Sequence, residues 1–193
     1  QKIKGFVQTI TYMPHFISTV VIVAMLNIFL TPKTGLLGRF LGSQSILDNA
    51  NAIAPIYWIS EVWQHVGWNA IIYLAALSSV DLSLYEAAKM DGAGRLQLIR
   101  YVDIPTIMPT CVILLIMNMG SVLNVGFEKV WLMQNAMNMP GSEVISTYTY
   151  KIGIQSFQFS YGTAIGLFNT VINFAFLIIA NWISKRVSDT SIF

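Results

Sequence analysis

The sequence predicts an all-α membrane protein, and composition, hydropathy and the order of apolar and polar stretches all lead to that class. Of its 193 residues, 55% are hydrophobic and 10% are charged, and the mean hydropathy is +0.62. Water-soluble domains carry about 25% charged residues, so this chain has too few to cover a globule in water. Because a helix needs about 20 mostly apolar residues to cross a bilayer, we expect membrane helices at 10–30, 57–80, 106–126 and 161–183.

Three polar segments connect these stretches. Residues 31–56 and 127–160 form two long loops. The first holds turn-forming residues, namely Pro32, Gly35, Gly38, Gly42 and Pro55, and the second holds Met133, Met137, Met139, Pro140 and Gly141. Loops of this length are often functional, and both docking of a partner and simple connection of two helices fit their composition. The third segment, 81–105, is rich in charged residues. No repeat or composition shift divides the chain, so one membrane domain is expected over 1–193.

The lysines and arginines predict the orientation, since they gather on the cytosolic side of membrane proteins. With the amino terminus inside, the segment 81–105 is cytosolic and the two long loops are outside. Seven basic residues then lie inside and four outside. The inner ones are Lys2, Lys4, Lys89, Arg95, Arg100, Lys185 and Arg186, and the outer ones are Lys33, Arg39, Lys129 and Lys151.

The cytosolic segment begins with the signature of a short helix. Ser83 lies three residues before Glu86, which is the spacing of a capping box. A helix is therefore expected to begin near Leu84 and to run through Met90.

The rest of this segment predicts a turn and a second helix. Gly92 and Gly94 permit a sharp reversal or a positive φ angle. The second helix is expected over 95–101 and to stop before Pro105, because proline disfavours helix at the residue that precedes it.

Two interpretations of this helical pair remain open. The small side chains of Ala87 and Ala88 would let the backbone of a partner approach, and the carboxylates of Glu86 and Asp91 could form salt bridges or cap backbone N–H groups. Alternatively, the segment is a solvated connection between two membrane helices.

Several polar side chains lie within or beside the apolar stretches, where they are costly and often functional. Asn118, Ser121 and Asn124 recur at three-residue spacing in and just after the third apolar stretch. Asn169 and Asn173 are four residues apart and share a face of the last helix. They could hydrogen-bond a sugar in a pore or bond to neighbouring helices.

Other residues in these stretches favour structural interpretations. Gly162 and Gly166 form a small-xxx-small pattern for close helix packing. Glu61 and His65 are four residues apart, and a structural pair is favoured over a proton relay. Cys111 lies in an apolar run and predicts a small buried side chain.

No enzyme chemistry is indicated. The chain has no Gly-x-x-x-x-Gly-Lys-Ser/Thr phosphate loop. His15, His65 and Cys111 do not have the spacing of a metal site, and no nucleophile is paired with a base. A net charge of +2 without a basic run gives no indication of nucleic-acid binding.

The segment 81–105 closely resembles the EAA loop of ABC importer permeases, which reads Glu-Ala-Ala, three residues, Gly, nine residues and Ile-x-Leu-Pro. The matching residues are Glu86, Ala87, Ala88, Gly92 and Pro105, with Val102 and Ile104 as mild substitutions. Residues 7–18, 61–68, 124–130 and the ending Ser-Asp-Thr-Ser-Ile-Phe are similar to the subgroup associated with oligosaccharide and polysaccharide uptake. The resemblance therefore covers essentially the whole chain.

This resemblance implies the type I ABC importer transmembrane fold in a bacterial plasma membrane. That fold has six membrane helices, so the first two are expected to be missing from this sequence. The implied partners are a second permease in a heterodimer, two ATP-binding subunits, an extracytoplasmic solute-binding protein and membrane lipids. ATP and Mg would be bound by the ATPase subunits. The residues that the resemblance assigns to coupling with these subunits are Glu86, Ala87, Ala88, Asp91, Gly92 and Pro105. It also implies that Asn118, Ser121 and Asn124 line the substrate path, since the family builds that path largely from this region.

The expected function is thus a permease subunit for oligosaccharides or other carbohydrates. Two alternatives remain. Importers of other solutes have related EAA loops, and a membrane scaffold or channel without ATP coupling would have the same composition.

Overall fold

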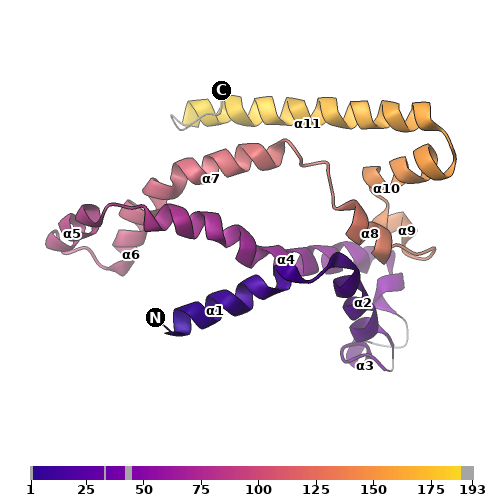
Figure 1. Ribbon diagram of the computed structural model, residues 1–193, viewed down its shortest axis with the longest axis horizontal. Coiled ribbons are helices and arrows are strands. Elements are labelled where there is room, and N and C mark those ends of the chain that lie inside the picture. The colour runs from indigo at the N-terminus through magenta and orange to yellow at the C-terminus, as the bar shows by residue number, and fades with distance from the viewer. Residues whose placement is uncertain (1, 33, 42–44, 188–193) are drawn as a thin grey trace. The chain divides into compact units, whose positions relative to one another are not determined.

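The computed structural model describes residues 2–32, 34–41 and 45–187, and within them it contains helices and connecting segments but no strand (Figure 1). Lys33 and the ending at 188–193 lie outside the described residues. The α-helices are α1 (Lys2–Tyr12), α2 (Thr19–Leu30), α3 (Gly38–Leu41), α4 (Ala50–Ser78), α5 (Leu82–Met90), α6 (Arg95–Leu98), α7 (Ile104–Met119), α8 (Phe127–Met133), α9 (Met139–Ser142), α10 (Ile145–Thr149) and α11 (Phe159–Val187). Short 3-10 turns η1 (Met13–Phe16) and η2 (Ile46–Asp48) and π-turns η3 (Ile99–Asp103) and η4 (Tyr150–Gln155) connect them.

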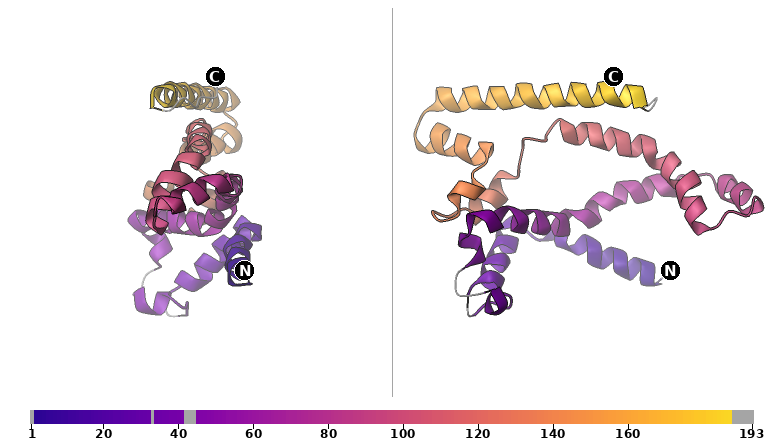
Figure 2. Two further views of the ribbon diagram at one scale, coloured as in Figure 1. Left: turned by 90° about the vertical axis from the view of Figure 1, so that its left-hand side faces the viewer. Right: turned by 180° about the vertical axis from the view of Figure 1, so that it is seen from behind.

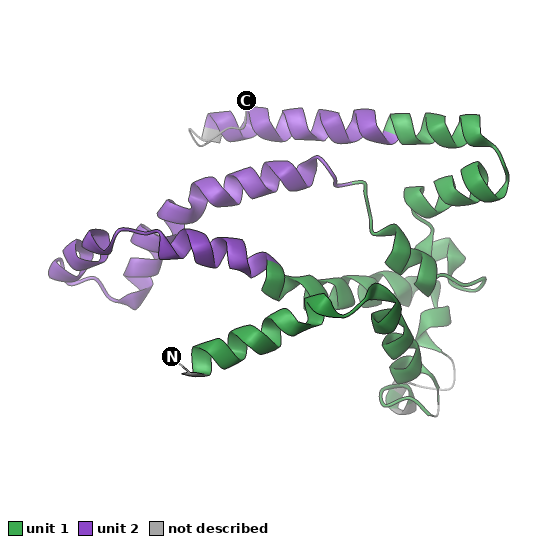
Figure 3. Cartoon of the chain, in the orientation of Figure 1, with its two compact units in different colours: residues 1–68, 123–168 green, residues 69–122, 169–193 purple. Residues whose placement is uncertain are grey.

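The chain forms two compact units, shown in Figure 3. The first consists of residues 1–68 and 123–168, and the second of 69–122 and 169–193. The first unit has a hydrophobic core built from α2, η2, α4 and α8, whose buried side chains are Val23, Leu30, Leu47, Ile53 and Met133. The single membrane domain expected over 1–193 stays a prediction.

In the second unit, the end of α7 packs on α11. A methyl group added at Gly120 would lie 2.9 Å from the Cδ1 atom of Leu177. Ile116, one turn earlier on α7, is 1% exposed. This contact joins two helices that are far apart in the sequence.

Among the described residues, two helices are long and apolar enough to cross a membrane, namely Arg95–Met119, which runs from α6 to the end of α7, and Phe159–Arg186 in α11. Figure 2 shows α11 as one unbroken helix from two sides. The number rises to four if each of two bent helix pairs forms one span. These pairs are Ile3–Phe16 with Thr19–Leu30, and Ala50–Ser78 with Leu82–Met90, and they bend by 97° and 69°. The orientation across the membrane stays a prediction.

The continuous helix expected over 10–30 is wrong, because the chain breaks between η1 and α2. Pro14 lies at the start of the 3-10 turn. Ser18 is extended, with φ −63° and ψ 147°, and its side chain accepts a hydrogen bond from the N–H of Val21. A serine in this conformation caps a new helix, so α2 starts in a different direction.

The expected boundaries differ at three further places. α4 begins at Ala50, so Pro55 lies inside a helix rather than in a loop. α7 ends at Met119, seven residues before the end expected for the stretch 106–126. The long loop expected at 127–160 contains α8, α9, α10 and η4.

Gly162 and Gly166, the two glycines on α11 that were expected to pack closely, lie in different environments. A methyl group at Gly162 would lie 2.9 Å from the Cα atom of Gly153 in η4, whereas one at Gly166 would meet nothing within 4 Å. Between Gly153 and Gly162, Phe157 has a φ angle of 58°. Close packing is therefore confirmed for Gly162 but not for Gly166.

We expect Gly162→Ala to lower the thermal stability of the detergent-solubilised protein, because the new methyl group pushes η4 away from α11. The control is Gly166→Ala, which adds the same group one turn later on the same helix. It should leave stability unchanged or raise it by about 1 kcal/mol, the helix propensity gained over glycine. Equal effects of the two substitutions would contradict this packing.

Candidate functional site

The first helix of the segment 81–105 is capped by an aspartate. Asp81 is extended, and its Oδ1 atom accepts a hydrogen bond from the N–H of Ser83 at 2.9 Å, so α5 begins at Leu82. Hydrogen bonds from the backbone and side chain of Ser83 lower the pKa of Asp81, since they favour the carboxylate. The capping box of Ser83 and Glu86, with a helix starting near Leu84, is therefore wrong. Asp81 fills the cap two residues earlier.

α5 ends in a Schellman motif, which fixes the turn that follows. The N–H of Gly92 donates to the carbonyl of Lys89 at 3.0 Å, and the N–H of Ala93 donates to that of Ala88 at 2.9 Å. These are the two hydrogen bonds that define the motif. Gly92 has a φ angle of 78°, which costs other L-residues about 1–2 kcal/mol. No atom would block a side chain there, so the backbone conformation alone requires glycine.

The second helix does not end before Pro105, contrary to the expectation for 95–101. α6, η3 and α7 form one helix, and the π-turn η3 lies directly before the proline. The N–H of Ile104 donates to the carbonyl of Ile99, five residues back. The hydroxyl of Thr106 donates to the carbonyl of Val102 at 2.7 Å. The wide turn lets the helix continue past a residue that has no N–H.

The residues expected to contact an ATPase lie on the surface of the second unit. Glu86, Ala87, Asp91 and Gly92 are exposed, and Ala88 is half-buried.

No residue of α5 is buried against the described parts of the chain. Apolar side chains are exposed as well, since Leu82, Met90 and Leu96 are 74%, 89% and 81% accessible. The helical pair thus presents both carboxylates and apolar side chains to its surroundings.

The first group of substrate-path residues does not share one helix face. Asn118 is exposed on α7, and its Nδ2 atom donates to the carbonyl of Leu114 at 2.8 Å. Because α7 ends at Met119, Ser121 lies in the following turn, where its hydroxyl donates to the carbonyl of Asn118 at 3.2 Å. Asn124 lies in the segment before α8 and belongs to the first unit. The three-residue spacing therefore does not build a continuous polar stripe.

The second group lies on α11. Asn173 is 6% exposed, and Asn169 is half-buried. Leu177, one turn after Asn173, is the residue that contacts the end of α7 at Gly120. The same face of α11 thus packs on α7, which favours the helix-packing interpretation for Asn173. A contact between these asparagines and substrate stays a prediction.

An ionic cluster around a buried lysine links helices of the first unit. Lys129 of α8 is 3% exposed, and its Nζ atom donates to Glu61 Oε2 at 2.8 Å and to Gln64 Oε1 at 3.2 Å. Gln64 in turn donates to the carbonyl of Ile17, at the break between η1 and α2, at 3.2 Å. Lys129 thus links α8 to α4, and Gln64 links α4 to the break between η1 and α2.

Two histidines extend this cluster. The pair expected at Glu61 and His65 is confirmed, with His65 Nδ1 3.2 Å from Glu61 Oε1. The ring of His15 lies 5.3 Å from that of His65 and stacks on Trp68 at 4.5 Å. The sequence did not point to Lys129 as a partner of this pair, because nothing local marks a lysine that is 68 residues away as its counter-ion.

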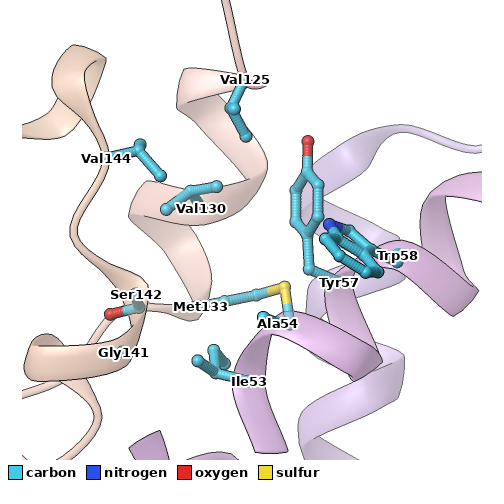
Figure 4. A pocket seen from close by; sticks show the side chains of 10 residues that line it. All are labelled: Ile53, Ala54, Tyr57, Trp58, Val125, Val130, Met133, Gly141, Ser142 and Val144. Atoms are coloured by element: carbon cyan, nitrogen blue, oxygen red, sulfur yellow. The ribbon is translucent and has the colours of Figure 1, made fainter. Parts of the chain in front are cut away.

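A small cavity of about 130 Å³ lies beside this cluster in the first unit (Figure 4). Its walls are mostly apolar, with the rings of Tyr57 and Trp58 on one side and Val125 and Val130 on the other. The Tyr57 hydroxyl accepts a hydrogen bond from the backbone N–H of Gly126 at 3.2 Å. A sugar needs polar groups that are free to bond with it, so we do not assign this cavity to substrate. Within the described residues, no group of three or more His, Cys, Asp or Glu side chains is placed to hold a metal ion.

The described chain thus combines apolar helices long enough to cross a membrane with an exposed, charged helical pair. Residues 1–189 match the family described as binding-protein-dependent transport system inner membrane component. The chain belongs to this family. The all-α membrane fold and the resemblance to importer permeases are thereby confirmed.

Two of the relatives that the chain matches are named for transport systems. The chain is 41% identical over 195 residues to the polygalacturonan/rhamnogalacturonan transport system permease protein YteP of Bacillus subtilis (strain 168), and 38% identical to its Protein LplB. Each alignment covers 98% of this chain and 61% of the relative. The sn-glycerol-3-phosphate transport system permease protein UgpA of Salmonella choleraesuis (strain SC-B67) is 33% identical over 119 residues, which cover 59% of this chain and 40% of that protein.

A solved structure shares the fold. It is a bacterial alginate ABC transporter in complex with an alginate pentasaccharide-bound periplasmic protein, and one of its chains superposes with a TM-score of 0.92 at 38% identity. The superposition covers 98% of this chain and 68% of that one. The fold expected for a type I importer permease is therefore confirmed.

We expect Lys129→Met to destabilise the first unit by about 2 kcal/mol or more, because it leaves Glu61 and Gln64 without their buried partner. The matched control is Lys151→Met. Its pair with Glu143 has a similar distance of 2.9 Å, but the side chain of Lys151 is 20% exposed, whereas the side chain of Lys129 is 4% exposed. Loss of that pair should cost under about 1 kcal/mol. Thermal unfolding in detergent measures both, and equal losses would contradict the role of burial.

Proposed function

We propose that this chain is part of the permease of an ATP-driven, binding-protein-dependent importer, and that its cargo is an oligosaccharide. The observation that carries the proposal is the exposed helical pair α5–α6, with a fixed glycine turn and uncovered apolar side chains. A protein partner of complementary shape would cover them. Family membership and the sugar-transport name of YteP support the same conclusion.

The proposed partners follow from this role. A second permease completes a heterodimer, two ATPase subunits bind on the cytosolic side, and a solute-binding protein delivers cargo from outside. The alginate transporter has a periplasmic protein of that kind. ATP and Mg are bound by the ATPase subunits, not by this chain.

Coupling is proposed to occur through α5 and the turn at Gly92. Closure of the ATPase pair on ATP moves α5, whose small Ala87 and Ala88 admit the partner's backbone. Glu86 and Asp91 supply carboxylates for that contact. Because α6 is continuous with α7, a displacement of the helical pair reaches a membrane helix without an intervening flexible loop.

The proposed cargo class is carbohydrate, and acidic oligosaccharides are the first candidates. YteP is named for polygalacturonan and rhamnogalacturonan. The superposed structure is that of a transporter for alginate, which is an acidic polysaccharide. An importer of a non-sugar solute is the alternative, supported by the similarity to UgpA over a shorter region.

The test is to purify the complete transporter in nanodiscs and to measure ATP hydrolysis with binding proteins loaded from a panel of solutes. The panel contains uronic-acid oligosaccharides, neutral oligosaccharides and glycerol 3-phosphate. Stimulation by an oligosaccharide-loaded binding protein is expected. Stimulation by glycerol 3-phosphate alone would contradict the cargo class, and a chain that does not co-purify with an ATPase would contradict the whole proposal.

Substitution of Gly92 should separate backbone conformation from side-chain size. Gly92→Val is expected to reduce substrate-stimulated ATP hydrolysis about tenfold, because a β-branched residue resists the positive φ angle by about 1–2 kcal/mol. Gly92→Asn, which adopts this conformation more readily, should retain most of the activity. Both are measured in the nanodisc assay, and equal activity of the two variants would argue against a conformational requirement.

A further inference from the structure

A side-chain contact joins α5 to the start of α7, apart from the chain that connects them. The hydroxyl of Tyr85 donates a hydrogen bond to the Oδ1 atom of Asp103. Tyr85 lies in the middle of α5, and Asp103 is the last residue of the π-turn η3. Both residues belong to the second unit, so the contact lies within one compact body.

Tyr85 lies on the inner face of α5. It is half-buried, as is Ala88 three residues later, whereas Glu86 and Ala87 between them are exposed. Residues three apart share a helix face. The tyrosine, on the face of α5 that it shares with Ala88, therefore points back towards its own chain. Glu86 and Ala87, two of the residues proposed to meet an ATPase, point outwards.

The π-turn places Asp103 in register for this contact. A π-turn holds one more residue than an α-turn, and each residue rotates an α-helix by about 100°. Without the extra residue, residues after the turn would be displaced around the helix by about that angle relative to those before it. The bond from the N–H of Ile104 to the carbonyl of Ile99 marks the wide turn. Val102, beside the aspartate, is 8% exposed.

The contact persists at physiological pH. The pKa of Tyr85 is raised, chiefly because its hydrogen bond to Asp103 favours the protonated phenol. A phenol that donates to a carboxylate forms one of the stronger classes of protein hydrogen bond.

We infer that Tyr85 and Asp103 form a positioning contact that fixes the angle between α5 and α7, so that a displacement of α5 moves the membrane helix. The inference rests on the proposed function. Neither residue is assigned to the surface that meets the ATPase. Loss of the contact lets α5 pivot on its two connecting turns, so ATP hydrolysis continues while less substrate is carried per ATP.

The test uses the complete transporter with Tyr85→Phe, Asp103→Ala, the double variant and Asp103→Asn, whose amide oxygen can still accept the hydrogen bond. In proteoliposomes we expect the ratio of substrate transported to ATP hydrolysed to fall about fivefold in both single variants, the effect of one lost hydrogen bond. The double variant should be no worse than either single one, and Asp103→Asn should retain most of the ratio. The control is Tyr101→Phe, which removes the hydroxyl of a tyrosine that is 70% exposed on η3.

Hydrogen exchange of α5 in the same variants supplies an intramolecular readout. Residues 82–90 should exchange about fivefold faster when the contact is removed, and at the wild-type rate in Tyr101→Phe. Unchanged exchange, or faster exchange with an unchanged transport ratio, overturns the inference but leaves the proposed function intact. A wild-type chain that assembles with no ATPase instead overturns the proposed function, and this outcome is visible before any variant is made.

Discussion

The structure depends on how its helix ends satisfy their backbone hydrogen bonds, because an unpaired N–H or carbonyl is costly in an apolar environment. At the first break, Ser18 caps α2, and Gln64 of α4 donates to the carbonyl of Ile17. At the charged segment, Asp81 caps α5 and the turn at Gly92 closes it with two backbone bonds. These local solutions set the directions of the helices, and the side chains that could act on a partner follow from those directions.

The apolar stretches could be predicted from composition, and the helical pair in 81–105 from its glycines and its resemblance to the EAA loop. The break inside 10–30 could not, because Pro14 and Ser18 add little polarity to a long apolar run. The passage of a helix through Pro105 also could not be predicted. It coincides with the π-turn η3, which hydrophobic periodicity does not report.

The ionic cluster shows why the candidate site was only partly predictable. Glu61 and His65 are one helical turn apart, so spacing reveals them. Lys129 is far along the chain, and its sequence neighbours suggest an exposed outer loop rather than 3% exposure. Burying an ammonium group is favourable only with partners that compensate for its lost hydration, and here Glu61 and Gln64 supply them. The cation is therefore better understood as part of the packing of α8 on α4 than as a marker of membrane topology.

Exposed apolar side chains have different consequences in different parts of this chain. On the spans Arg95–Met119 and Phe159–Arg186, only 11% and 6% of the most apolar window is buried, and lipid or neighbouring helices can cover the rest. The apolar side chains of Leu82 and Met90 on α5 are also exposed. However, α5 carries the charged residues Glu86 and Lys89 as well, and Asp81 and Asp91 flank it. Charged groups at this density are costly in hydrocarbon, so lipid is a poor cover for that helix. We therefore expect the apolar side chains of α5 to be covered by the surface of another protein, one that also accommodates the adjacent charges.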